Sequence, residues 1–237
     1  VPCSDLTYAL ARIRPGRDVL HVATLTLDLP ATTINVTQPM IVDGANTTVI
    51  GHGATPAISI ASGLSLTLES LTLSNNIEVN GSSATLRVFD VRGLSARFVH
   101  AGGSMTIQSS SLEASSSVSC STTGTLVIEA STILQSLVAA NACTVRLERS
   151  KLLTSSHGLD IIGGTATVEN NLLVATSSLA DLLRVSGGNS ALRFNTIVNT
   201  SATMADGVAL DCDATTRVTS NIIAYNSANP IGGTCPI

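Results

Sequence analysis

Aromatic residues and charges are both scarce in this chain of 237 residues. Aromatic residues make up 2% of the sequence, and tryptophan is absent. Charged residues make up 12%, about half of the ~25% that is usual for soluble domains. The shortage of Trp and Tyr disfavours a stacking platform for neutral sugars, because these rings usually supply much of the affinity.

Basic residues are few, and Lys151 is the single lysine. The chain has 12 Lys and Arg against 16 Asp and Glu, a net charge of −4. A nucleic-acid partner is therefore not expected. No apolar run approaches the ~20 residues of a membrane-spanning helix, so no membrane span is expected. Hydrophobic residues still make up 44% of the chain, which excludes a disordered protein.

The five cysteines are Cys3, Cys120, Cys143, Cys212 and Cys235. They form no CxxC pair and no cluster with histidine, which disfavours a zinc site. A composition rich in Ser and Thr and poor in lysine predicts an exported protein, extracellular or at the cell surface, where disulfides persist. Cys212 and Cys235 can pair across the last part of the chain. Cys120 lies in an alternating run and is interpreted as a small buried hydrophobe. Cys3 is the candidate for the odd cysteine, and the pairing of Cys3, Cys120 and Cys143 stays open.

A short alternating segment recurs about every twenty residues and is the most informative feature of the sequence. Each copy has two apolar residues separated by one polar residue. A second alternating run precedes each copy by about ten residues, and a further apolar pair follows it. The second apolar positions of the copies are Leu68, Val88, Ile107, Ile128, Leu147, Val168, Phe194 and Val218.

Three short strands in each repeat cannot bury their apolar sides alone, but stacked repeats can. The pattern therefore predicts an all-β parallel solenoid of about eight to ten coils. A sandwich of hairpins is the alternative, and it would require two-residue Asn-Gly or Asp-Gly turns, which are scarce here.

Helical spacing is confined to the start of the chain, at Leu6, Leu10 and Ile13, before Pro15-Gly16. We expect a short helix there that caps the first coil and protects its edge. Residues 1–34 are thus interpreted as an N-terminal cap and residues 35–237 as the solenoid, together one domain. The thin end at Pro230–Cys235 is compatible with a monomer or an end-to-end dimer.

Several segments resemble the pectin-lyase-like superfamily of single-stranded right-handed parallel β-helices. The opening Cys3-Ser4-Asp5-Leu6-Thr7-Tyr8-Ala9, the following Pro15-Gly16 and the segment Val42-Asp43-Gly44-Ala45 are similar to exported members. The resemblance implies a right-handed β-helix. It implies no single activity, because the fold hosts lyases, hydrolases, epimerases, adhesins and passive surface domains. The sharper enzyme signatures are missing: Gly51-His52-Gly53 stands in the first coils without the acidic segments that precede it in polygalacturonases.

Outward residues next to the repeated apolar positions are expected to form ladders, because successive coils stack about 4.8 Å apart. One predicted ladder contains Glu129, Glu148 and Glu169, and it places Asn195 in the coil of Phe194. Three stacked carboxylates repel one another unless a cation or Arg146 lies between them. Two interpretations stay open: a calcium site built from these glutamates, or a solvated face screened by water, Arg146 and Arg149. No cofactor is required.

A second constellation lies at the expected strand starts of three C-terminal coils. His157, Asp181 and Asp206 are predicted to stack near one column, with Arg184 beside them. Asp160, Asp211 and Asp213 are expected further along the same groove. Carbohydrate-active members of the superfamily place acid, base and arginine along such a groove, and stacked carboxylates separate each other's pKa values. His-Gly and Asp-Gly are also ordinary turn sequences, so catalysis is left undecided.

The leading interpretation is an exported or cell-surface β-helix domain with a structural, adhesive or polysaccharide-contacting role and no catalysis. The alternative is a polysaccharide lyase or glycoside hydrolase that acts on an acidic polysaccharide through the C-terminal groove. An ice- or crystal-binding face is disfavoured, because Arg87 and Arg146 interrupt the outward threonines Thr67, Thr106 and Thr167.

Overall fold

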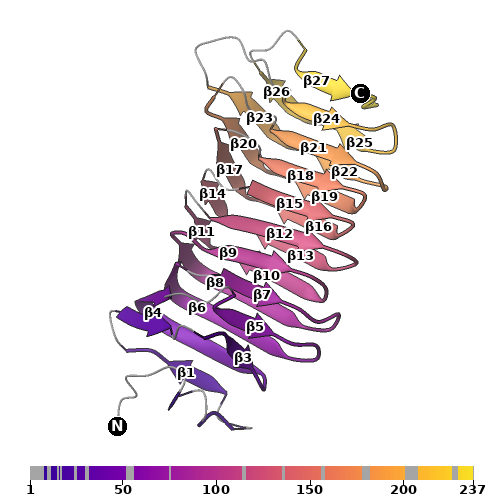
Figure 1. Cartoon of the computed structure of the whole chain (residues 1–237). Helices are drawn as coiled ribbons and strands as arrows, with labels where there is room; N and C mark the ends of the chain where they lie inside the picture. Colours follow the sequence, from indigo (N-terminus) through magenta and orange to yellow (C-terminus); the bar gives the residue numbers. More distant parts are fainter. Residues whose placement is uncertain are drawn as a thin grey trace.

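The chain winds into a parallel β-solenoid of about eight turns in the computed structural model (Figure 1). The structure describes residues 8–9, 12–14, 16, 18–23, 26–29, 32–51, 56–74, 76–113, 116–134, 137–155, 158–177, 182–200, 208–225 and 229–236. The strands of successive coils pair in parallel and build two sheets, one of ten and one of seventeen strands. The predicted all-β solenoid is therefore confirmed.

The ten-stranded sheet takes one short strand from each coil. Its members are β3 (Ile34–Val36), β5 (Ile58–Ile60), β7 (Asn76–Val79), β9 (Arg97–His100), β12 (Ser117–Ser121), β15 (Leu137–Asn141), β18 (Leu159–Ile162), β21 (Leu183–Ser186), β24 (Leu210–Cys212) and β27 (Ile231–Gly233).

The seventeen-stranded sheet has two halves joined at a bend. Three long strands run through both halves: β4 (Met40–Gly51), β6 (Ser65–Ser74) and β8 (Thr85–Gly93). The first half adds β1 (Val19–His21), β10 (Ser104–Gln108), β13 (Thr125–Glu129), β16 (Thr144–Glu148), β19 (Thr165–Glu169), β22 (Ala191–Arg193) and β25 (Arg217–Thr219). The second half adds β2 (Thr26–Leu29), β11 (Ser111–Leu112), β14 (Thr132–Leu134), β17 (Lys151–Thr154), β20 (Leu172–Ala175), β23 (Thr196–Asn199) and β26 (Ile222–Ala224).

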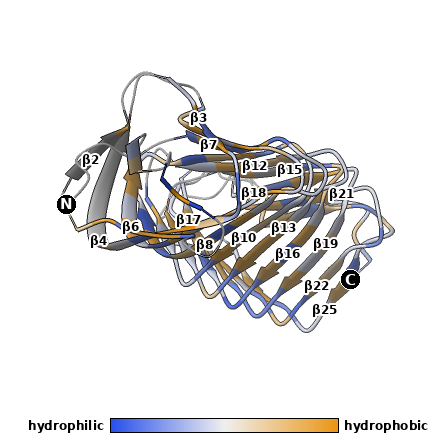
Figure 2. Cartoon of the chain, turned by 90° about the horizontal axis from the view of Figure 1, so that it is seen from below, coloured by the Kyte–Doolittle hydropathy of each residue, from blue (hydrophilic) through white to orange (hydrophobic). Residues whose placement is uncertain are grey.

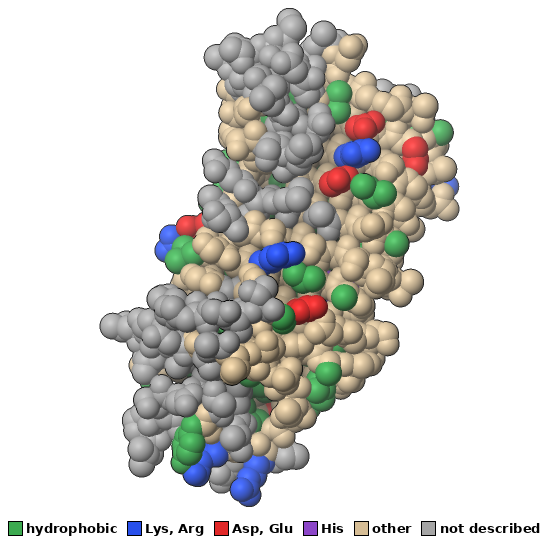
Figure 3. Space-filling model, viewed as in Figure 1, with side chains coloured by type: hydrophobic (Ala, Val, Ile, Leu, Met, Phe, Trp, Pro, Cys, Tyr) green, Lys and Arg blue, Asp and Glu red, His purple; other side chains and the backbone are tan. Residues whose placement is uncertain are grey.

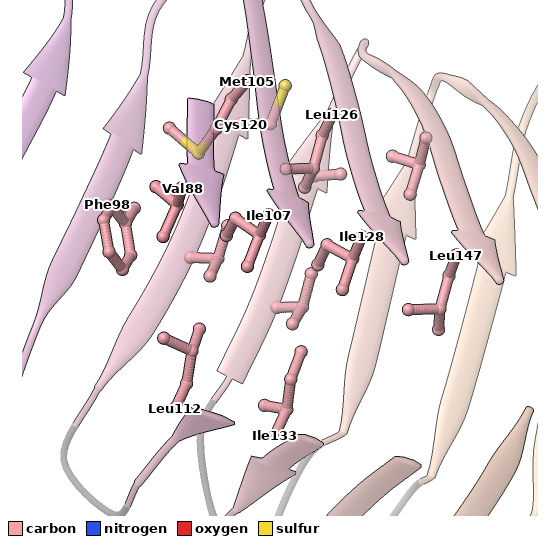
Figure 4. Close-up of a cluster of buried hydrophobic side chains, with 14 of the residues drawn as sticks. Val88, Phe98, Met105, Ile107, Leu112, Cys120, Leu126, Ile128, Ile133 and Leu147 are labelled. Carbon is pink, nitrogen blue, oxygen red and sulfur yellow. The ribbon is translucent and has the colours of Figure 1, made fainter. Parts of the chain in front are cut away.

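The core fills the inside of the coil with stacked aliphatic residues, as alternation along each strand predicts. In β13, for example, Leu126 and Ile128 are fully buried, whereas the flanking positions are partly exposed. Apolar and polar colours alternate along the strands in Figure 2. Val88, Ile107, Ile128 and Leu147 stack from coil to coil in Figure 4, in agreement with the register of their strands.

One residue in a left-handed conformation makes the bend between the two halves in each coil. Nine such residues, among them Asp90 and Asn170, have φ between 43° and 58°. The residue after the bend points inward, and from the coil of β10 onward these residues form an internal polar ladder. Its members are Ser110, Ser131, Ser150, Asn171, Asn195 and Asn221.

The internal ladder satisfies backbone groups that the bend removes from strand pairing. Each hydroxyl or amide oxygen accepts the N–H of the preceding coil, as in Asn171 N–H to Asn195 Oδ1 at 3.1 Å. The amide of Asn195 also donates to the carbonyl of Val168 at 2.8 Å.

The prediction for the coil around Phe194 is wrong by two residues. Val168 pairs in register with Leu192, and Leu192 with Val218, so Leu192 is the buried residue. Phe194 is 55% exposed, because it occupies the left-handed bend, with φ 58°. Arg193 therefore takes the outward position after Glu169, and Asn195 belongs to the internal ladder.

The expected capping helix is not seen. Of the segment that was predicted to form it, residues 1–7, 10 and 11 lie outside the described residues. The described part is one turn, closed by a hydrogen bond from Arg12 N to Ala9 O at 3.0 Å. Ile13 packs against the core of the first coil.

Candidate functional site

Each strand of the ten-stranded sheet has one outward residue that lies between two inward residues. These outward residues are register partners from strand to strand, and we call the row that they form the outer column. Figure 3 views the molecule from the side of this sheet, where few charged side chains interrupt the surface. The column consists of Asn35, Ser59, Glu78, Val99, Ser119, Ala139, Asp160, Arg184, Asp211 and Gly232.

Three residues of the predicted C-terminal groove are consecutive members of the outer column. Arg184 pairs in register with Asp160 on one side and Asp211 on the other. Arg184 Nε lies 3.8 Å from Asp211 Oδ2, and the two side chains are 52% and 39% exposed. Water therefore screens this ion pair. Asp160 differs from Asp211 in that its Oδ1 is buried and has no hydrogen-bond partner.

His157, Asp181 and Asp206, the other members of the predicted constellation, lie outside the described residues. In the sequence they precede the strands of the column residues: β18 starts at Leu159, β21 at Leu183 and β24 at Leu210. The structure thus brings together Asp160, Arg184 and Asp211, and their convergence with the three preceding residues stays a prediction.

Asp213 lies beyond the end of β24 and stabilises the turn that follows. Its Oδ1 accepts hydrogen bonds from the N–H and hydroxyl of Thr215 at 3.0 and 2.7 Å. Its Oδ2 accepts the N–H of Gly187 in the preceding coil at 2.5 Å. The hydrogen bonds from Thr215 and Gly187 lower the pKa of Asp213 to about 2. These contacts assign Asp213 to turn stabilisation and occupy both of its oxygens.

The three stacked glutamates each have an arginine partner. Arg146 contacts both carboxylate oxygens of Glu148, with Nη2–Oε2 at 2.7 Å. Glu129 pairs with Arg149, and Glu169 pairs with Arg193 at 3.2 Å. The hydrogen bonds from Arg146 hold the pKa of Glu148 below its usual value. A calcium ion would have to compete with three guanidinium groups for these oxygens. No group of three or more His, Cys, Asp or Glu suited to a metal was found within the described ranges.

Two disulfides join neighbouring coils. Cys212 pairs with Cys235, as the sequence suggested. Cys120 pairs with Cys143, which corrects its interpretation as a free buried hydrophobe. In each bridge the first cysteine lies in a strand of the ten-stranded sheet, and the second lies in the turn after the next strand of that sheet. The two cysteines are 23 residues apart in both bridges. Cys120 and Cys212 lie in the same inward column, four coils apart. The spacing of the cysteines in the sequence does not show this.

His100 is fully buried in the same inward column, between Val79 and Cys120. Its Nδ1 lies 3.4 Å from Cys120 Sγ, and its Nε2 is buried without a hydrogen-bond partner. Burial lowers the pKa of the imidazole, and the carbonyls of Gly103 and His100 itself offset only part of this effect. A methyl group on Gly124 would lie 2.0 Å from the ring, so the ring requires glycine there. Sequence reasoning missed this residue, although His100 occupies an apolar position of an alternating run.

The internal ladder was also missed, and its sequence signal is simple. Ser or Asn stands three residues after the buried marker, as in Ile128 and Ser131 or Val168 and Asn171. Applied to Leu192, the same spacing gives Asn195 and the correct register.

Comparison with known proteins gives no match, whether with protein-family models, with curated proteins or with solved structures. Within the described residues, no helix has the length and apolar character needed to cross a membrane.

Proposed function

We propose that this chain is an exported or cell-surface β-helix domain that contacts an extended polysaccharide along the outer face of its ten-stranded sheet, without cleaving it. The observation that supports this proposal is the outer column, which continues in register through ten strands from Asn35 to Gly232. Its members Ser59, Val99 and Ser119 have short side chains, and Glu78 lies between Ser59 and Val99. A face of this kind offers a straight, shallow track to a linear polymer.

The charges of the face favour a neutral polymer over an acidic one. At the C-terminal end, two carboxylates, Asp160 and Asp211, flank the single guanidinium of Arg184. A uronate polymer would meet net repulsion there. This charge balance disfavours the acidic polysaccharide that the enzyme alternative assumed.

An extracellular role is compatible with the two disulfides, because such bridges persist in oxidising compartments. The right-handed β-helix of the pectin-lyase-like superfamily remains our proposal for the ancestry of the solenoid. It is supported by the Val42-Asp43-Gly44-Ala45 segment, which lies in β4 of an early coil.

Glycoside hydrolysis is the second candidate, and the spacing of the Asp160 and Asp211 carboxylates in the outer column favours it. Asp160 and Asp211 stand on β18 and β24, two strand spacings apart, roughly 9.6 Å. This separation is close to the upper end of the range for inverting enzymes, about 6.5–9.5 Å.

Two pairs of variants test the proposal. Retention on insoluble neutral polysaccharides (cellulose, xylan and mannan) is measured by co-sedimentation. Ser119→Arg places a long side chain in the middle of the outer column, and Thr106→Arg adds the same charge to the same coil on the other sheet. Arg87 is the register neighbour of Thr106, so arginine is tolerated there. We expect retention of the wild type and of Thr106→Arg, and loss of retention for Ser119→Arg.

The release of reducing ends in the same samples tests catalysis. Turnover that disappears in Asp160→Asn but persists in Glu78→Gln, a remote member of the same column, would establish the hydrolase. Retention without reducing ends supports the non-catalytic proposal. Equal retention of Ser119→Arg and wild type contradicts it.

A further inference from the structure

A groove of about 390 Å³ lies on the seventeen-stranded sheet, where the two halves meet in the early coils. This volume lies in the range of small-molecule sites, about 300–1,000 Å³. The groove crosses the bends of β6 and β8 and continues past β11 and β14, which follow one another along the solenoid (Figure 1). It is lined by Leu71, Thr72, Asp90, Val91, Arg92, Ser109, Ser110, Ser111, Ala130 and Thr132.

The groove exists because short side chains lie between long ones. Outward positions of the second half follow the register Arg92, Ser111, Thr132 and Lys151. The bend residues beside them are Asp90, Ser109, Ala130 and Arg149. One coil presents the long side chains Asp90 and Arg92 at these two positions, and a later coil presents Arg149 and Lys151. The two coils between them present only serine, alanine or threonine. Asp90 and Arg92 line the groove, together with Leu71 and Thr72 of the coil before them.

The lining offers hydrogen bonds without net charge. Asp90 and Arg92 supply one carboxylate and one guanidinium. Arg92 Nε lies 2.5 Å from Glu113 Oε1, which fixes the plane of the guanidinium. The hydroxyl of Ser70 donates to Asp90 Oδ2 at 3.3 Å. Ser109, Ser111 and Thr132 add hydroxyl groups, while the hydroxyl of Ser110 is occupied by the carbonyl of Gln108.

This chemistry matches the hydroxyl groups of sugars. A fixed carboxylate and a fixed guanidinium bind neighbouring hydroxyls through charge-assisted hydrogen bonds, and serine and threonine complete the set. The apolar floor, Leu71 and Val91, is 3% and 2% exposed, so an apolar peptide side chain finds no pocket there. Asp90 and Glu113 are offset by Arg92 and by Lys151 of the following coil, so no net positive charge is present to favour an acidic sugar. The lining includes no aromatic ring, so stacking contributes nothing to the affinity.

We infer that the groove between Asp90 and Thr132 is a binding site for a neutral oligosaccharide. It lies on the seventeen-stranded sheet, apart from the outer column of the ten-stranded sheet. The inference does not rest on the proposed function. A chain of hydroxylated rings lies along the solenoid axis, with one end at the Asp90 and Arg92 side chains and the middle over Ser111 and Thr132.

Titration of neutral pentasaccharides of the cello-, xylo-, manno- and malto- series tests the site by calorimetry or by ligand-observed NMR. The disruptive variant is Ser111→Leu/Thr132→Leu, which fills the groove without changing the charge. Leucine is native at the same register position in a later coil, at Leu172, so the fold tolerates it. Thr106→Leu is the matched control on β10 of the same coil, where the next register partner is Val127.

At least one neutral pentasaccharide is expected to bind the wild type and Thr106→Leu with equal affinity. The double variant should bind about tenfold or more weakly, because it loses several hydrogen bonds. Asp90→Asn, an exposed substitution, should weaken binding without changing the unfolding temperature. All titrations are repeated in a Ser119→Arg background, in which the outer column is blocked, and there the loss in the groove variants should be the same, so failure of the proposed function is distinguishable from failure of this inference. The inference is overturned if no pentasaccharide binds, if the double variant binds as well as wild type, or if oligogalacturonate binds more tightly than the neutral probes.

Discussion

Mild acid should destabilise the solenoid through His100, whose imidazole lies in the core without charged neighbours on its inward column. Burial holds the pKa of His100 below its ordinary value of 6.5. In the unfolded chain the imidazole regains that ordinary value and takes up a proton as the pH falls below about 6.5. The unfolded state then binds more protons than the folded state. Stability that is fully present above pH 6.5 is therefore lost as the pH falls toward the folded pKa.

The size of this loss follows from proton linkage. If the folded imidazole stays neutral, lowering the pH from 7.5 to 5.5 removes at most about 1.4 kcal/mol of unfolding free energy. In His100→Leu this contribution is absent. Leucine also leaves no unpaired Nε2, a defect that costs about 1–3 kcal/mol when buried. We expect His100→Leu to be at least as stable as the wild type at pH 7.5.

Urea unfolding followed by far-ultraviolet circular dichroism at pH 7.5 and 5.5 measures the effect. His21→Gln is the matched control, because His21 is an exposed histidine whose Nδ1 contacts Asp43 Oδ2 at 2.8 Å. The wild type and His21→Gln should lose more stability between the two pH values than His100→Leu does. An identical pH dependence for the wild type and His100→Leu would refute the argument.

Three other predictions concern the framework. Asn195→Ala should lower the unfolding free energy by about 2–4 kcal/mol, because it leaves the buried N–H of Asn171 and the carbonyl of Val168 unpaired. Chemical denaturation measures this loss, and a value below about 1 kcal/mol would contradict the prediction. Gly124→Ala should lower the melting temperature by several degrees, because the added methyl group meets the His100 ring, and combining it with a smaller residue at position 100 should restore stability; a melting temperature equal to that of the wild type would argue against this packing. Under native conditions a thiol reductant should open Cys212–Cys235 before Cys120–Cys143, because Cys235 is partly exposed while Cys120 and Cys143 are buried; mass spectrometry after alkylation gives the order, and the reverse order would refute it.

The sequence predicted the solenoid well because inward stacking repeats with a regular period. The markers Leu68, Val88, Ile107, Ile128 and Leu147 are register partners in the structure, as expected. The prediction failed at Phe194, because Leu192 and Phe194 are both apolar and only one of them can occupy the buried position. The bend falls at Phe194, so Leu192 is buried, and apolarity alone does not predict where the bend falls.

Pairing of side chains between coils was less predictable than the strands. The Cys120–Cys143 bridge depends on which turn follows which strand, and it is found only when the coils are stacked. The ion pairs of Glu129, Glu148 and Glu169 use three arginines at different distances along the sequence, of which the sequence suggested Arg146 and Arg149. In the predicted groove, Asp160, Arg184 and Asp211 were identifiable because each is the outward residue after an inward leucine.

Chemical-shift mapping of the isotope-labelled protein with neutral pentasaccharides tests the proposed contact surface most directly. If the outer column is the contact surface, backbone amides of β9, β12 and β15 in the ten-stranded sheet shift on titration, Ser119→Arg abolishes these shifts, and the sugar signals stay those of intact pentasaccharide. Shifts confined to the groove around Ser109–Ser111, no shifts at all, or the appearance of shorter oligosaccharides would contradict a non-catalytic contact along the outer column.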